Sequence, residues 1–174
     1  MIISLYDLSI GSYLQTVPAV VNTLKKGVAH CEERGINADD WVQKRLVDDM
    51  LPLQFQVNSV YWHSLGAARA VLSGHFSPPP KSEVVSYSGL ITQLENTVNE
   101  LQSIESNLIN ERVGETLIFQ LGESQIPFLS EDFIVSFSLP NLHFHATTTY
   151  DLLRMEGVAL GKRDYLGQLK LKRS

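Results

Sequence analysis

The chain has 174 residues, of which 44% are hydrophobic and 19% charged, with a formal net charge of −5 and a single cysteine. This length predicts one domain over residues 1–174, large enough to bury a core without a metal or a disulfide. The acidic balance argues against a nucleic-acid partner, which needs a basic face, and one cysteine cannot form an intramolecular disulfide.

The ends of the sequence favour a cytoplasmic protein without a membrane partner. Residues 1–7 contain no basic segment followed by an apolar run, and no stretch approaches the roughly 18 to 20 apolar residues of a membrane span. Residues 162–174 hold five basic residues and one acidic residue. Most such ends are solvated, and an anion or partner contact is the alternative.

The first predicted element is a long helix. Apolar residues recur at steps of three and four from Leu14 to Cys31, which predicts one buried helical face with Cys31 packed on it. Gly35 then favours a helix end, because glycine tolerates the left-handed conformation. Pro18 predicts either a kink or a helix that begins near Thr16.

Two further helices follow in the same way. Capping side chains predict a short helix over residues 37–46, and Pro52 suits the first turn of a second long helix over residues 53–73. The three prolines of residues 78–80 predict an extended connection. Helical spacing over residues 87–109 predicts a third long helix.

The last part of the chain changes period twice. Alternating apolar residues over 115–129 predict a β-hairpin, and Ser130 with the acids after it predicts the start of a fourth long helix that bends at Pro140 and ends at Gly157. Together these elements predict an all-α four-helix bundle with long crossover connections and a small β-hairpin before the last helix.

A candidate site lies on two of these helices. Gln56, Val60 and His63 are separated by steps of four and three, so His63 points with the apolar face toward the interior. It is a candidate ligand or base. The alternative is a core histidine whose ring nitrogens are paired by its neighbours.

The fourth helix carries the other candidates. On a helix the rings of His143 and His145 project about 200° apart and cannot share an ion, so we expect His143 near the surface. Asn141 and His145 are four residues apart and share one face, with Thr148 close by. The predicted inward set is therefore His63, Asn141 and His145.

Several motifs carry a family resemblance. The most specific are FSLPNLHFHATTTYDLLR at residues 137–154 and GKRDYLG at residues 161–167, and the same pattern includes SLYD at 4–7 and DDMLPL at 48–53. The sequence resembles a domain-of-unknown-function family, found in fungi and bacteria, of the DinB/YfiT-like superfamily of metalloenzymes. The resemblance covers essentially the whole chain.

The resemblance implies a DinB-type four-helix bundle and a divalent metal, zinc or nickel among others. In that pattern three histidines hold the ion, one on the second helix and two spaced four apart on the last, and some members work with low-molecular-weight thiols. His63 and His145 match two of these places, whereas Asn141 takes the third. Because an amide oxygen is a weak zinc ligand, the expectation is either no cofactor or a metal held by His63, His145 and one further group.

The hypothesis for function is a small-molecule enzyme, an isomerase or lyase. His63 and His145 would exchange protons with the substrate, with or without a metal, and Asn141 would orient a carbonyl or hydroxyl group. The predicted substrate-binding residues are Gln56, Trp62 and Thr148. The alternative is a non-catalytic bundle that binds a hydrophobic ligand or associates as a homodimer.

Other mechanisms receive no support from motifs. The sequence contains no glycine-rich phosphate loop, no GxSxG elbow and no HExxH. Residues 161–165 predict a turn after the last helix, with Arg163 or Asp164 pairing to a helix end, and the alternative is an anion contact at the mouth of the pocket.

Overall fold

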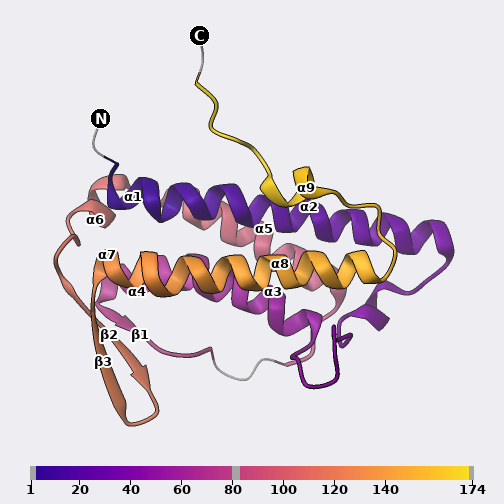
Figure 1. The fold of residues 1–174 in the computed structure, drawn as a ribbon, viewed down its shortest axis with the longest axis horizontal. Coiled ribbons are helices and arrows are strands. Elements are labelled where there is room, and N and C mark those ends of the chain that lie inside the picture. Colours follow the sequence, from indigo (N-terminus) through magenta and orange to yellow (C-terminus); the bar gives the residue numbers. More distant parts are fainter. Residues whose placement is uncertain (1–2, 80–82, 173–174) are drawn as a thin grey trace.

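The computed structural model describes residues 3–79 and 83–172 (Figure 1). The chain begins with α1 (Leu5–Leu8) and α2 (Ile10–Arg34). The predicted stop at Gly35 is confirmed, since this residue has a φ of +66° and caps the helix. Pro18 lies inside α2, which starts at Ile10, so a helix start near Thr16 is wrong.

The second long helix is confirmed over residues 53–73, but it is not uniform. It consists of α3 (Leu53–Tyr61), a π-helical turn (Trp62–Gly66) and α4 (Ala67–Ser73), which follow one another without a break. The predicted short helix over 37–46 is smaller than expected and forms only a 3-10 turn (Ala38–Trp41).

The third predicted helix is divided. It forms α5 (Tyr87–Ser103) and α6 (Ser106–Asn110), because the backbone at Ile104 is extended. The predicted hairpin is confirmed as β2 (Thr116–Leu121) and β3 (Ser124–Leu129), which pair antiparallel.

One strand was not predicted. The strand β1 (His75–Phe76) pairs parallel to β2 and completes a three-stranded sheet in the order β1, β2, β3. The connection after it, predicted over the prolines of residues 78–80, is without helix or strand as far as Pro79, and Pro80 lies outside the described residues.

The fourth long helix is also continuous and also contains a π-helical turn. It consists of α7 (Ser130–Phe133), the turn (Ile134–Ser138) and α8 (Leu139–Met155). Pro140 directly follows the π-helical turn, inside the continuous helix, and has no backbone N–H to donate there. A short helix, α9 (Lys162–Leu166), follows.

The long helices pack side by side around one core. Both α2 and α3 pack along α5 and along α8, and α2 meets the second long helix at its π-helical turn. In Figure 1, α2 and α8 run from left to right, whereas the segment from α3 to α4 runs the opposite way. The fold is therefore mostly helical with a small three-stranded sheet at one end.

Close helix packing depends on one glycine. The buried Tyr87 hydroxyl donates to the Leu24 carbonyl at 3.1 Å, and a Cβ on Gly27 would lie 2.3 Å from that hydroxyl oxygen. Cys31 lies in the same core with 1% of its surface exposed, as its place on the helical face predicted.

The motif at residues 161–165 has a structural role. The Asp164 carboxylate accepts a hydrogen bond from the Gly161 backbone N–H at 2.8 Å and pairs with Lys26 of α2 at 2.6 Å. The contact with Lys26 and, second, the contact with Gly161 lower the pKa of Asp164. Residues 162–166 thus form a short helix where a turn was predicted, and Asp164 caps the N-terminus of that helix, whereas Lys26 lies inside α2. Within the described ranges, no helix is long and apolar enough to cross a membrane.

Candidate functional site

Two histidines from different helices face each other. His63 lies in the π-helical turn after α3 and is 8% exposed, and His145 lies in α8 and is partly buried. Their ring centroids are 5.8 Å apart and the ring planes differ by 10°. The structure therefore brings together the two histidines that the sequence placed on inward faces.

Gln56 determines the tautomer of His145. The Gln56 side chain donates from Nε2 to the Leu51 carbonyl at 2.8 Å, so its Oε1 faces His145 Nδ1, also at 2.8 Å. Because an amide oxygen can only accept, Nδ1 of His145 carries the proton and Nε2 carries the lone pair. Gln56, predicted to bind substrate, thus uses both ends of its amide within the protein.

His63 is enclosed by aromatic rings. Phe76 and Phe137 lie with centroids 5.8 and 5.5 Å from its ring. Its Nδ1 atom is buried and has no hydrogen-bond partner in the described part of the chain. A buried polar atom without a partner costs about 1–3 kcal/mol, so its presence in a native core needs a reason.

Both histidines are neutral at physiological pH. Burial lowers the pKa of His145 to about 4. Burial and, second, the like charge of His145 lower the pKa of His63 to about 4. Each ring therefore has one nitrogen with a free lone pair, which can accept a proton, and one N–H, which can donate a hydrogen bond.

The other predicted residues of α8 are placed differently. Asn141 is partly buried and donates from Nδ2 to the Phe137 carbonyl, and Thr148 is buried and donates to the Phe144 carbonyl, both at 2.8 Å. Both side chains thus bond to their own helix. His143 is exposed, as expected.

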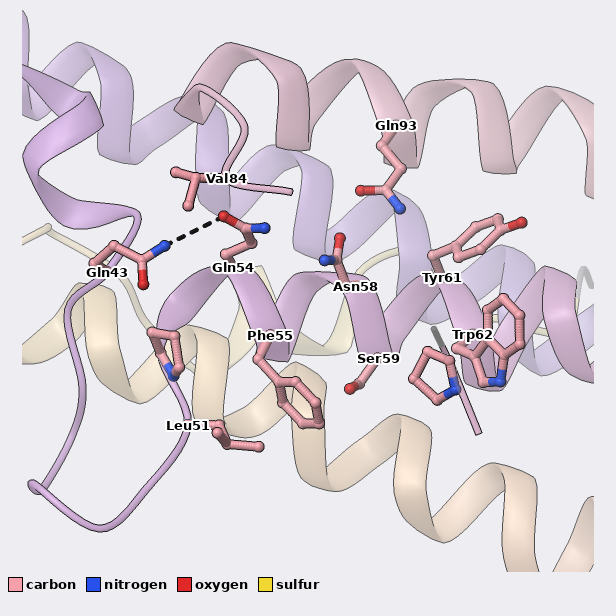
Figure 2. Close-up of a pocket in the computed structure, with 12 residues that line it drawn as sticks. Gln43, Leu51, Gln54, Phe55, Asn58, Ser59, Tyr61, Trp62, Val84 and Gln93 are labelled. Carbon is pink, nitrogen blue, oxygen red and sulfur yellow. Dashed lines mark hydrogen bonds between the residues drawn. The ribbon is translucent and has the colours of Figure 1, made fainter. Parts of the chain in front are cut away.

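A cavity of about 520 Å³ lies beside α3 (Figure 2). Trp62, a predicted substrate-binding residue, lines it, but His63 and His145 do not. The cavity is adjacent to the histidines all the same: its wall includes Phe55, whose ring packs on His145 at 5.8 Å. Its other described lining residues are Gln43, Leu51, Pro52, Gln54, Asn58, Ser59, Tyr61, Pro79, Val84 and Gln93.

Two supporting residues were missed at the sequence level. Ser138 donates from its hydroxyl to the His63 carbonyl at 2.8 Å, and the buried Tyr13 hydroxyl lies 2.7 Å from Ser138 Oγ. A carbonyl can only accept, so Ser138 uses its proton there and Tyr13 must donate to Ser138. Tyr13 could have been noticed as a tyrosine one turn before Val17 on the apolar face of α2, whereas only its place in the motif at residues 137–154 marked Ser138.

Comparison with known proteins identifies the family and a similar fold. Residues 5–166 match the sequence profile of a domain of unknown function (DUF1993). The chain belongs to this family. The crystal structure of a DinB family member protein from Shewanella denitrificans is similar, with a TM-score of 0.79 over 98% of this chain and 96% of that chain at 22% identity. This likeness concerns the fold, and no curated protein matches.

The donor set of this DUF1993 chain does not fit a three-histidine metal site. His63 and His145 supply two imidazoles, and the third place holds Asn141, a neutral and weak zinc ligand. Among residues 3–79 and 83–172, no three His, Cys, Asp or Glu side chains are grouped to hold an ion. The candidate site therefore offers two imidazoles and an amide in place of three imidazoles.

Proposed function

We propose that this protein is a small-molecule enzyme, an isomerase or lyase, in which His63 and His145 transfer protons within a DinB-type four-helix bundle. The supporting observation is the pair of buried neutral imidazoles, one held in a single tautomer by Gln56 and the other with an unpaired buried nitrogen. An unpaired buried nitrogen alone does not mark a site, since His30 Nε2 is also unpaired among the described residues, and it is the second imidazole facing His63 that distinguishes this pair.

The two imidazoles have different roles in this proposal. His145, with its proton held on Nδ1, offers Nε2 as the base that removes a proton from carbon next to a carbonyl group. A base whose pKa is about 4 is weak at first. As negative charge develops on the substrate, that charge stabilises the imidazolium and raises its pKa. His63 donates an N–H to the carbonyl oxygen where the charge develops.

Proton removal can be tested without knowing the physiological product. An enzyme of this kind catalyses exchange of the substrate C–H with D2O, which one-dimensional proton NMR follows directly. We expect exchange in a panel of α-hydroxy ketones and 2-oxo acids, for example 3-hydroxybutanone and 2-oxobutyrate, at rates above buffer.

Matched variants locate the activity. The double variant His63→Gln/His145→Gln should exchange at the buffer rate, whereas His75→Gln, which removes an exposed histidine of β1, should keep the wild-type rate. A folded double variant with the wild-type rate would show that the pair is not the base. No exchange in any compound would favour the alternative, a non-catalytic ligand-binding bundle.

A further inference from the structure

The cavity beside α3 has the size and lining of a small-molecule site. Its volume of about 520 Å³ lies within the usual range for such pockets. None of its described lining residues is an acid, a base or a histidine. Among the described lining residues, none supplies a counter-charge to a charged ligand, whose burial without one is costly.

Aromatic side chains form one wall of this cavity. Figure 2 shows Tyr61 and Trp62 at one end and Phe55 on the side toward α8. The Trp62 indole N–H donates to the Ser77 carbonyl at 2.7 Å, so the ring is held in place and presents apolar surface. Fixed aromatic walls favour flat rings, which stack on them.

Polar side chains also line the cavity. Asn58 extends from α3 and Gln93 from α5 into the same space in Figure 2. The Gln93 amide makes no hydrogen bond in the described part of the chain, and neither does the hydroxyl of Ser59, although Ser59 is only 2% exposed. An amide offers a donor and an acceptor side by side, which complements the edge of a nucleobase.

We propose that this cavity binds an uncharged heteroaromatic ring of the nucleobase kind, stacked on Trp62 and hydrogen-bonded to Gln93 and Ser59. A purely apolar ring would leave the amide and the hydroxyl unpaired. The inference goes beyond the proposed function and does not rest on it, because neither histidine lines the cavity and the contact with the pair runs through Phe55, which packs on His145.

Binding can be measured without turnover. The probes are adenine and uracil, with benzoate as a charged control and toluene as an apolar control, observed by saturation-transfer NMR and titration calorimetry. We expect adenine or uracil to bind with a Kd below about 1 mM and at least about tenfold more tightly than either control. Gln93→Leu and Ser59→Ala should each weaken that binding about tenfold, the effect of one lost hydrogen bond.

A matched variant on the same helix is Gln102→Leu, which alters an exposed residue of α5 and should leave the Kd unchanged. The inference is overturned if neither base binds, if benzoate or toluene binds as tightly, or if Gln93→Leu binds like the wild type. Suppose that adenine or uracil binds the folded His63→Gln/His145→Gln variant, while neither the wild type nor any variant catalyses C–H exchange with D2O. That result would overturn only the proton-transfer proposal.

Discussion

The two site histidines make stability depend on pH in a defined direction. Burial lowers the pKa of each to about 4, from the ordinary value of 6.5. Between these values the unfolded chain binds more protons than the folded chain, so this contribution is complete above pH 6.5 and is lost as the pH falls toward 4. We expect the free energy of unfolding, measured by urea denaturation at stepped pH, to fall by a few kcal/mol over this window.

His143, whose pKa is also lowered by burial, contributes within this window, whereas two carboxylates with lowered pKa values do not. The pKa values of Asp7 and Asp164 are lowered from 3.8 by hydrogen bonds, so both groups titrate at more acidic pH. The free energy of unfolding should therefore depend less on pH in His63→Gln/His145→Gln and should keep its wild-type pH dependence in His75→Gln. An equally steep slope in the double variant would assign the acid sensitivity to other groups.

A second prediction at the residue scale concerns Gln56. Replacing it in Gln56→Glu places a carboxylate beside the Nδ1–H of His145, and an opposite charge at this distance should raise the pKa of that histidine well above about 4. In Gln56→Met the Nδ1–H loses its acceptor, and the Nε2–H tautomer should become populated. Proton–nitrogen correlation spectra of the imidazoles report both effects. A dominant Nδ1–H tautomer in Gln56→Met would show that Gln56 does not control it.

At the scale of elements, both long helices that carry the site contain a π-helical turn. His63 lies in the turn Trp62–Gly66, and Ser138 ends the turn Ile134–Ser138. The hydrogen bond from the Ser138 hydroxyl to the His63 carbonyl joins the two turns, and Tyr13 of α2 extends it. Such turns interrupt regular helical bonding and are frequent at functional sites. The backbone of His63 is therefore held by hydrogen bonds that involve two other helices.

Removing this chain of hydrogen bonds should destabilise the fold unequally. Ser138→Ala leaves both the His63 carbonyl and the Tyr13 hydroxyl buried without partners, for an expected loss of about 2–4 kcal/mol, whereas Tyr13→Phe removes one donor and should cost about 1 kcal/mol. The double variant should be less destabilised than the sum of the two, as a double-mutant cycle in urea measures. Additive losses would mean that the two hydroxyls act independently.

The same turns show what spacing can and cannot predict. Steps of three and four residues located the long helices, because a buried helical face needs that period. An inserted residue in a π-helical turn leaves no such mark, and the two residues of β1 are too few for any period. The break at Ile104 escaped notice for a related reason, since α5 and α6 both keep helical spacing.

At the scale of the whole molecule, the site was predictable only where side chains follow from helix faces. His63 and His145 lie on the inward faces of their helices, so packing the helices brings them together. The contact of Gln56 with His145, the contact of Ser138 with His63 and the cavity beside α3 depend on how helices distant in sequence are placed. No local pattern contains that information.

The last prediction concerns Asn141, the position where this chain departs from the three-histidine pattern. Asn141 lies one turn before His145 on α8, so Asn141→His should complete a set of three imidazoles with His63 and His145. We expect zinc retained after dialysis, measured by elemental analysis, to rise to about one equivalent, since three histidines form a common catalytic zinc set. Asn99→His, on the exposed surface of α5, is the matched control.

Further variants show whether His63 and His145 hold the zinc ion in this experiment. Zinc retention should disappear again when His63→Gln is added to Asn141→His, because the ion then loses a ligand on the opposite helix. If Asn141→His retains no more zinc than the wild type, the parallel arrangement of the two rings, rather than the missing donor, prevents coordination. If the wild type itself retains one equivalent, His63 and His145 suffice with a further ligand, and the imidazoles are metal ligands rather than bases.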